Sequence, residues 1–506
     1  MFAPPSPPAV SRREWGWLAA IVAAGLIVRF AFPSHAVVEH YDEGVYASNL
    51  YQPDGSGAYP DRHLYAPPLW PAVIEWTVLL FGPQAAAWPS MIAGGLLPIV
   101  CWQIARDVSG ASRAGLVAAA LAAFDPMLIL YSRTALVDMP LTLLLATSIA
   151  CAIRGVDRGR WGWLLAAGGA AGLAWATKYN GWLASAIPVA AAIAWGVGSR
   201  RVWTATRVLV VPAIAALAFG VVLFGLRETG GYGPVAANHA RYFGGFSQWL
   251  ANAATQVANA AGLWAITAAT LPVALVAAIW PLLRFREATF GQWTLAAWLI
   301  SLTLAIPLYA PYPRLLVPLL PAIAIGVGVA VGRLSLPPWS GRLPIPLGLA
   351  AAVTVIAGSP ALRPRTAAAF VADAVVGNLT REPLDGVQGF AVYVLSEPGA
   401  FFQLAARQDA ARPPYVAIPA GSLIVGDAAG TPPGLRPMLL IGPHAAADGI
   451  ADVGRDSRFA LVGTIDARPS RLVRLNRSGA GRGGILNDRY TLYRIVPVAE
   501  SGEAAE

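Results

Sequence analysis

The apolar run WLAAIVAAGLIVRFAF, residues 17–32, is long enough to enter a membrane and contains one charged residue, Arg29. Apolar windows of about 17–25 residues, each able to cross a hydrocarbon core of about 30 Å, recur from Trp15 to about Gly358 and then stop. Of the 506 residues, 56% are hydrophobic and 12% are charged, whereas roughly a quarter are charged in soluble domains. The sequence therefore predicts a polytopic α-helical membrane protein with a soluble C-terminal part.

The windows predict about eleven transmembrane helices. They cover roughly 16–33, 84–105, 113–132, 135–153, 161–178, 181–197, 206–226, 262–283, 291–309, 314–332 and 343–359. Arginines fall in every second connection, which is the bias of cytoplasmic loops. With a cytoplasmic N-terminus, the first loop (34–83), the second large loop (227–261) and the C-terminal part lie outside the cytoplasm. Within the first loop, the short, proline-rich segment 65–82 is expected to be an interfacial helix.

This pattern predicts two domains, a membrane domain over 1–359 and an extracytoplasmic domain over 360–506. The protein is expected to be a multi-pass protein of the plasma membrane. In the second domain, short apolar stretches bounded by Gly and Pro predict strands, and two longer segments predict helices. The strands are expected at 390–395, 422–427, 437–442, 459–465 and 490–496, and the helices at 370–379 and 399–408. This alternation favours a small soluble α/β domain.

Charge and cysteine content narrow the function classes further. The net charge is +9, but the arginines of the membrane part fall mainly in short connections between apolar runs, as in cytoplasmic loops, so a nucleic-acid partner is not expected. Cys101 and Cys151 both lie in membrane runs, so they imply no disulfide framework. The first run lacks a small-residue cleavage site after it and is expected to remain as an anchor. The segment GGAAGLA, 168–174, is typical of close helix packing rather than of a phosphate loop.

The remaining charged residues that stand out gather on the predicted outer side. They are Asp42 and Glu43 in HYDEGVYAS (40–48), Arg133 and Asp138 in YSRTALVDMP (131–140), Lys178 in TKYNG (177–181) and Arg314 in APYPRLL (310–316). Lys178 is the only lysine in a chain with 35 arginines, since lysine and arginine together number 36. Ionisable residues at the edge of hydrocarbon are costly and often functional. Helix capping by the acids and snorkelling by Lys178 are the structural alternatives.

Three cations and three acids around one outer cavity suit a lipid-linked phosphate next to a carboxylate. Phosphate oxygens accept hydrogen bonds from Arg and Lys, and a carboxylate can take a proton from an attacking hydroxyl. A carrier for lipid-linked sugars would also need a cationic cavity. However, a transporter is expected to have inverted repeats and broken helices near the midplane, and neither pattern is visible in the sequence.

The order of these segments resembles the GT-C superfamily of integral-membrane glycosyltransferases. The resemblance rests on the Asp-Glu pair after the first span, PPL (67–69), SRTALVDMPL (132–141), GLAWATKYNG (172–181) and YPR followed by PLLP (312–314 and 318–321). It covers roughly residues 15–335, and its closest branch holds the protein O-mannosyltransferases and the lipid A aminoarabinose transferases. The resemblance implies inverting transfer of a sugar from a polyprenyl-phosphate donor to a cell-envelope lipid, glycan or protein.

The resemblance also implies roles for the charged residues. Asp42 matches the acid regarded as catalytic base, Glu43 is its neighbour, and Asp138 matches a second acid that supports the first. Arg133, Lys178 and Arg314 fall where cations reach the donor phosphate. Further candidates, for binding sugar or acceptor, are Tyr41, His239, Arg241 and Tyr242.

Departures from the family pattern leave the acceptor open. The mannosyltransferases have a histidine directly before the prolines, whereas here three residues separate His63 from Pro67; the aminoarabinose enzymes have a lysine where this chain has Ala66. Transport of lipid-linked sugars and a glycan ligase with an oligosaccharide carrier remain alternative functions. The sequence does not decide whether a divalent metal is required, because no ligand spacing is present.

Overall fold

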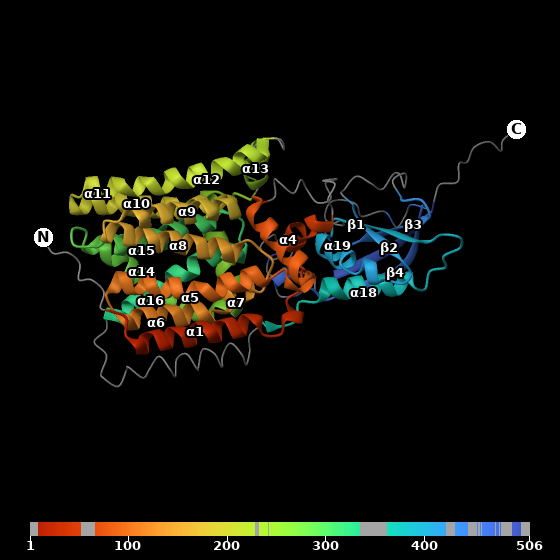
Figure 1. Cartoon of the computed structure of the whole chain (residues 1–506), viewed down its shortest axis with the longest axis horizontal. Coiled ribbons are helices and arrows are strands. Elements are labelled where there is room, and N and C mark those ends of the chain that lie inside the picture. Colours follow the sequence, from red (N-terminus) through yellow and green to blue (C-terminus); the bar gives the residue numbers. More distant parts are fainter. Residues whose placement is uncertain are drawn as a thin grey trace.

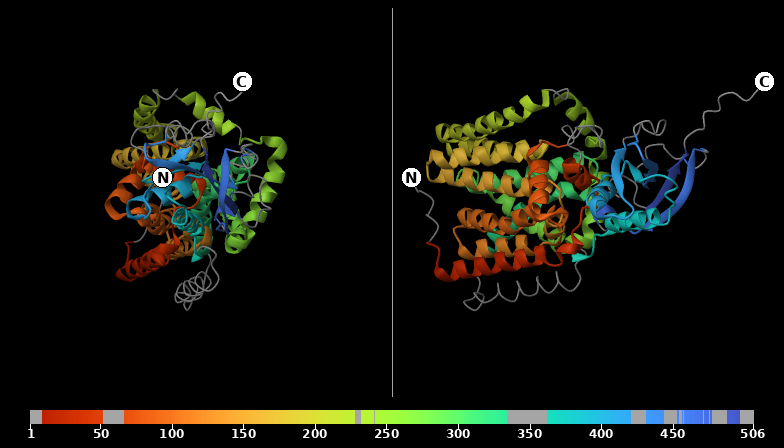
Figure 2. Two further views of the ribbon diagram at one scale, coloured as in Figure 1. Left: turned by 90° about the vertical axis from the view of Figure 1, so that its right-hand side faces the viewer. Right: turned by 45° about the vertical axis from the view of Figure 1, so that its right-hand side comes forward.

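The computed structural model describes residues 9–51, 66–227, 232–240, 242–333, 362–420, 431–443, 453, 456, 458–470, 472–474, 476 and 488–496. Its long axis joins two parts, a bundle of helices and a domain built on a β-sheet (Figure 1). The bundle helices run side by side along this axis when the molecule is turned (Figure 2). The predicted class, a helical membrane protein with a C-terminal α/β domain, is confirmed.

The bundle is formed by twelve of the helices that the structure describes. They are α1 (Arg12–Phe30), α5 (Trp88–Ser109), α6 (Ser112–Phe124), α7 (Pro126–Ser132), α8 (Asp138–Asp157), α9 (Trp161–Thr177), α10 (Leu183–Ser199), α11 (Val202–Thr206), α12 (Val210–Leu226), α14 (Trp249–Leu283), α15 (Phe290–Ala305) and α16 (Leu320–Arg333). Within the described ranges, six helices are long and apolar enough to cross a membrane, or seven if α6 and α7 form one span bent by 55°.

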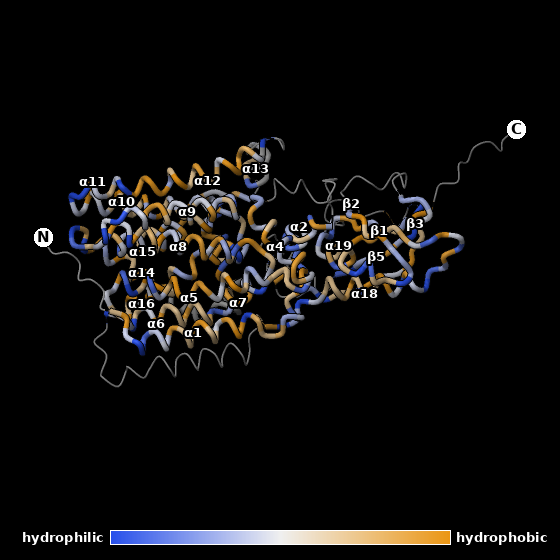
Figure 3. The backbone as a smooth tube through the Cα atoms, viewed as in Figure 1, coloured by the Kyte–Doolittle hydropathy of each residue, from blue (hydrophilic) through white to orange (hydrophobic). Residues whose placement is uncertain are grey.

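The predicted spans from 16 to 332 all coincide with helices, and the span at 343–359 lies outside the described residues. The helix around 262–283 begins earlier than predicted, at Trp249, inside the segment assigned to the second outer loop. Hydropathy along the backbone follows the same plan: the bundle is mainly apolar, and polar residues gather at the helix ends far from the β-sheet domain (Figure 3).

Three short helices lie at the end of the bundle that faces the β-sheet domain. They are α2 (Tyr41–Ala47), α4 (Leu69–Phe81) and α13 (Tyr232–Ala240). Helix α4 corresponds to the segment for which an interfacial helix was predicted, and its exposed Trp76, Leu80 and Phe81 give it an apolar outer face. Figure 1 places α4 between the bundle and the β-sheet domain.

The C-terminal domain contains a five-stranded mixed sheet in the order β2-β1-β3-β5-β4. Strand β1 is parallel to β2 and β3, whereas β5 is antiparallel to β3 and β4. The strands and helices are β1 (Gly389–Leu395), β2 (Tyr415–Ala420), β3 (Leu435–Ile441), β4 (Phe459–Ala467), β5 (Asp488–Ile495), α18 (Ala367–Leu379) and α19 (Pro398–Ala405). Strand β1 is buried along its whole length, as expected for a central parallel strand.

Most of the predicted elements of this domain are present. The sequence missed β2, whose Pro419 interrupts the strand pattern. The strand predicted at 422–427 lies outside the described residues.

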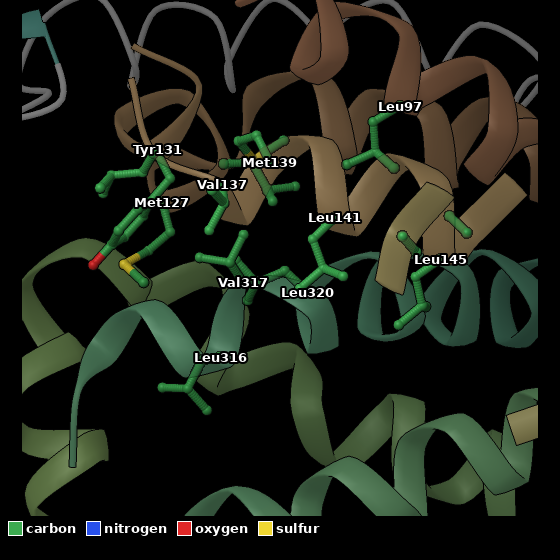
Figure 4. Packing of buried hydrophobic residues seen from close by; sticks show 14 of the residues in the cluster. Leu97, Met127, Tyr131, Val137, Met139, Leu141, Leu145, Leu316, Val317 and Leu320 are labelled. Atoms are coloured by element: carbon green, nitrogen blue, oxygen red, sulfur yellow. The ribbon is translucent and has the colours of Figure 1, made fainter. Parts of the chain in front are cut away.

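A buried apolar cluster supports the segments that carry the predicted site residues. Figure 4 shows Val137 next to Val317, with Met139, Tyr131 and Met127 nearby and the Leu316 side chain directed away from them. Val137 and Met139 flank Asp138, and Leu316 and Val317 follow Arg314 closely in sequence. All of these apolar side chains are less than 9% exposed, so the cluster fixes the backbone on both sides of the charged residues.

Small residues set the spacing of α9 and α12, as GGAAGLA predicted. A Cβ atom at Gly168 would lie 2.6 Å from Cβ of Ile214, and one at Gly172 would lie 2.5 Å from Cβ of Ala218. At Gly169 a Cβ atom would meet nothing within 4 Å. Two glycines of one helix therefore face α12, while a third faces open space.

This difference predicts the effects of two substitutions on the same helix. Gly172→Leu forces α9 away from α12, and overpacking of this kind costs about 1–3 kcal/mol. Gly169→Leu adds the same side chain to an open face and should not lower stability, because glycine is a poor helix former. The apparent melting temperature of the detergent-purified protein measures both effects, and equal losses for the two variants would contradict the packing argument.

Candidate active site

Helix α2 begins with a capping box that sets the positions of the two adjacent acids. The backbone N–H of Asp42 donates to Nδ1 of His40 at 3.1 Å, and the N–H of His40 donates to Oε2 of Glu43 at 2.9 Å. These bonds satisfy amides that the first helical turn leaves without partners. Tyr41 is the first residue of this turn and is partly buried. The two carboxylates thus leave the same turn in different directions.

Asp42 forms an ion pair with Arg314, although 272 residues separate them in sequence. Arg314 lies in the 3-10 helix η9 (Pro313–Leu319), and its guanidinium lies 5.4 Å from the ring centroid of Tyr312. The arginine side chain is 24% exposed and that of Asp42 is 7% exposed. The cation therefore remains within reach of a ligand.

Asp138 and Lys178 form a second ion pair, with 2.7 Å between Oδ1 and Nζ. Asp138 begins α8, and Lys178 follows the last residue of α9. The lysine side chain is 21% exposed. Oδ2 of Asp138 is buried and has no hydrogen-bond partner in the part of the chain that the structure describes. A buried polar atom without a partner is rare, so this oxygen is available to bind a donor.

Tyr46 joins the two ion pairs into one cluster. It follows Asp42 by four residues on α2 and is 5% exposed, so both side chains lie on one face of the helix. Burial raises the pKa of the Tyr46 hydroxyl well above its usual value, and the negative charges of Asp42 and Asp138 add to this effect, while Arg314 opposes it. The hydroxyl therefore stays neutral. Sequence analysis missed Tyr46, although its four-residue spacing from Asp42 was a usable signal.

The second large loop lies against this cluster through aromatic contacts. The His239 and Tyr179 rings are 5.6 Å apart at 80°, and the Tyr242 and Tyr312 rings are 5.9 Å apart at 74°. Tyr179 and Tyr312 are the chain neighbours of Lys178 and Pro313, respectively. Two of the residues predicted to bind sugar or acceptor thus lie near the cations, while Arg241 lies outside the described residues.

Glu43 has different neighbours from Asp42. Its side chain is fully buried. Its carboxylate accepts hydrogen bonds from the backbone N–H groups of Glu39, His40 and Ala135, at 3.3, 2.9 and 2.8 Å. Nη2 of Arg365 lies 2.9 and 3.0 Å from its two oxygens. These donors occupy both oxygens of Glu43.

Arg133 is also directed into the protein. Its guanidinium donates to backbone carbonyls of Arg29, Ala31 and Phe32 at the end of α1, with distances of 2.8 Å to Arg29 and 3.1 Å to Phe32. Burial lowers the pKa of Arg133 to about 10, and the nearby Arg365 also lowers it. The group is therefore still a cation at neutral pH, but its bonds hold the end of α1.

Arg365 was missed by sequence analysis because it lies beyond the last predicted span. Besides Glu43, it donates to the carbonyls of Arg133 at 2.9 Å and Val37 at 2.6 Å. Its backbone pairs with Ala36 in an isolated parallel bridge. One arginine therefore ties the start of the C-terminal domain to the first loop.

No group of three or more His, Cys, Asp or Glu residues within the described ranges has the arrangement needed to hold a metal ion. His40 uses Nδ1 as a cap, and His63 lies outside those ranges. The side chains of Arg314 and Lys178, 24% and 21% exposed, are cations of this cluster that a ligand can reach.

Residues 65–224 match the family model described as dolichyl-phosphate-mannose-protein mannosyltransferase. A polyprenol-phosphate-mannose–protein mannosyltransferase of Mycolicibacterium smegmatis is 28% identical over 201 residues, which cover 33% of this chain and 39% of that protein. The chain thus matches well under half the length of this curated relative. These matches confirm the predicted resemblance to the mannosyltransferase branch.

Solved structures extend the similarity to the whole fold. ArnT from Cupriavidus metallidurans bound to undecaprenyl phosphate has a TM-score of 0.61 and 17% identity, with 96% of this chain and 98% of that chain covered. The archaeal oligosaccharyltransferase AglB from Archaeoglobus fulgidus, in complex with an inhibitory peptide and a dolichol-phosphate, has a TM-score of 0.52 and 13% identity. That alignment covers 78% of this chain and 63% of AglB. At these identities the likeness establishes an ArnT-like fold.

The bonds of Glu43 predict a large effect of a small substitution. Glu43→Gln removes the charge opposite the buried Arg365, and breaking a buried pair costs about 3–5 kcal/mol. As a control, Glu287→Gln removes one partner of the pair with Arg284, whose side chains are 70% and 56% exposed, so no measurable loss is expected. Thermal unfolding in detergent compares the two, and an unchanged melting temperature for Glu43→Gln would show that the pair does not hold the fold together.

Proposed function

We propose that this chain is an inverting glycosyltransferase that takes a sugar from a polyprenyl-phosphate carrier. The observation that carries the proposal is the cluster of Asp42–Arg314 and Asp138–Lys178, with both cations partly exposed. Support comes from the match to the mannosyltransferase family model and from the fold likeness to ArnT, which has been solved with undecaprenyl phosphate. The acceptor is a hydroxyl group of a cell-envelope lipid, glycan or protein.

In the proposed reaction, Arg314 and Lys178 bind the phosphate of the donor. Asp42 accepts the proton of the acceptor hydroxyl, whose oxygen forms a bond to the anomeric carbon. The bond between that carbon and the phosphate oxygen breaks on the opposite side, and its electron pair stays on the phosphate. The two cations stabilise this leaving group where negative charge develops.

The ion pairs of the site explain how binding and base strength are linked. A phosphate that binds Arg314 competes with Asp42 for the same guanidinium. As the guanidinium turns to the phosphate, Asp42 loses part of the positive field that stabilises its charged form, and it becomes a stronger base. Asp138 holds Lys178 by a bond that uses only one of its oxygens.

The other predicted residues receive supporting roles. The neutral hydroxyl of Tyr46 is assigned as a hydrogen-bond donor to the reacting groups of the cluster, while Glu43 and Arg133 position the loops around it. His239, Tyr242 and Tyr41 lie on the outer elements and are assigned to sugar or acceptor binding. Arg241 is assigned to the same role from its place in the sequence.

We place the reaction on the extracytoplasmic side of the plasma membrane. Helix α2, which carries Asp42, lies at the bundle end that faces the β-sheet domain (Figure 3). The opposite helix ends carry or adjoin Arg12, Arg106, Arg113, Arg154, Arg160, Arg200, Arg284 and Arg333. Loops rich in arginine remain in the cytoplasm, so the site end faces away from it.

Asp42→Asn tests the proposed base. With radiolabelled polyprenyl-phosphate monosaccharides and a membrane extract as acceptor, the variant should lose about 10²–10⁴-fold in rate, because the amide cannot accept the proton. Binding of the donor lipid should persist, since Arg314 and Lys178 remain. Asp385→Asn, in an exposed turn of the C-terminal domain, is the matched control and should retain activity.

Two outcomes would remove parts of this proposal. Full activity of Asp42→Asn would exclude Asp42 as the base. If the wild-type protein binds the lipid but transfers no label with any sugar of the panel, transport of the lipid-linked sugar becomes the better explanation.

Single-cysteine labelling tests the orientation. Arg381→Cys and Glu287→Cys both introduce an exposed thiol, whereas the native Cys101 and Cys151 are buried. A membrane-impermeant maleimide added to intact cells should label the variant at 381 in the C-terminal domain and spare the variant at 287. The reverse pattern would place the site in the cytoplasm.

A further inference from the structure

Helix α2 lies between the charged cluster and helix α19 of the C-terminal domain. Asp42 and Tyr46 are four residues apart and share the face that meets Arg314. Gly44 lies between them in sequence, so it points to the other side of the helix. There it meets the start of α19.

The contact between α2 and α19 leaves no room for a side chain. A Cβ atom at Gly44 would lie 2.3 Å from both the backbone N of Gly399 and the carbonyl carbon of Pro398. A Cβ atom at Gly399 would lie 2.8 Å from the backbone oxygen of Glu39. Glycine within a helix costs about 0.5–1 kcal/mol relative to alanine. In a helix of only seven residues, Gly44 is therefore explained by the close approach of the two backbones.

Helix α19 is held as a rigid support for this contact. All eight of its residues are buried, and the hydroxyl of Tyr415 on β2 donates to the carbonyl of Leu404 at 2.8 Å. Toward the first loop, Nε2 of Gln403 donates to the carbonyl of Val38 at 3.1 Å. The Phe402 ring packs edge-on against Tyr51, with centroids 5.6 Å apart.

We infer that the C-terminal domain is a working part of the active site, because α19 fixes the depth at which α2 presents Asp42 to Arg314. Gly44, Gly399 and Gln403 are positioning residues that act through Asp42. This inference rests on the proposed function. A displacement of about 1 Å at a reacting group can lower a rate by about 10²-fold, so a single methyl group at this contact is sufficient to slow the reaction.

Gly399→Ala tests the inference. Its methyl group pushes against Glu39, and kcat should fall about 10–100-fold, with KM for the donor lipid and its direct binding within about twofold of wild type. Gly377→Ala on α18 is the matched control, because a Cβ atom there meets nothing within 4 Å. Gln403→Leu removes the bond to Val38 together with the bond that Oε1 accepts from Nη1 of Arg407 at 2.8 Å. Because Arg407 keeps its bonds to Asp373 and to the Gln403 carbonyl, this is the milder second variant, with an expected three- to tenfold loss, about 1 kcal/mol for the hydrogen bond to Val38.

The results separate this inference from the proposed function. If wild type transfers sugar and both Gly399→Ala and Gln403→Leu keep the kcat of Gly377→Ala, α19 does not position Asp42. A loss confined to KM would also overturn the inference, since it would place the contact in donor binding. Hydrogen exchange of amides 41–47 gives a readout that does not depend on activity. Faster exchange in Gly399→Ala than in Gly377→Ala would show that α19 holds α2 in place, even if no sugar is transferred. Equal exchange in the two variants would overturn the inference.

Discussion

The candidate site depends on the hydrogen bonds and the ion pair of the buried Glu43 carboxylate. This carboxylate joins the start of α2, the amide of Ala135 and the guanidinium of Arg365 at distances of 2.8–3.3 Å. An isolated charge in such a position would be very unfavourable. Here several donors replace water around it, so three segments far apart in sequence must meet at one point for the charge to be tolerated.

The Glu43 junction also positions the proposed reactive groups, although it does not contact their side chains. Asp42 immediately precedes Glu43, and Asp138 follows Ala135 by three residues. Both acids are therefore positioned by the same buried junction. Their cations come from other parts of the chain, from η9 and from the end of α9. In the proposed function a ligand phosphate contacts these two cations, and the apolar cluster in Figure 4 holds the backbone beneath them.

The sequence predicted the parts of the structure that depend on local composition. Apolar windows located the bundle helices, and the rarity of outer charges indicated Asp42, Asp138, Lys178 and Arg314, which the structure arranges as two ion pairs. It did not distinguish Arg314 from Arg133, because both are arginines predicted on the outer side. The difference lies in direction: Arg133 turns to the carbonyls at the end of α1, and the choice between backbone and ligand is made by tertiary packing.

The adjacent acids of α2 illustrate why the remaining roles could not be read from the sequence. Successive residues of a helix point about 100° apart, so one carboxylate meets Arg314 while its neighbour meets Arg365. The adjacent residues Asp42 and Glu43 do not by themselves show which carboxylate points to which arginine. Gly44 gives this information indirectly, because it permits α19 to approach only one side of the helix. The C-terminal domain thereby decides which acid is buried in the scaffold and which remains at the site. The C-terminal domain, which the sequence presents only as a soluble segment after the last span, therefore helps to position the residues of the proposed reaction.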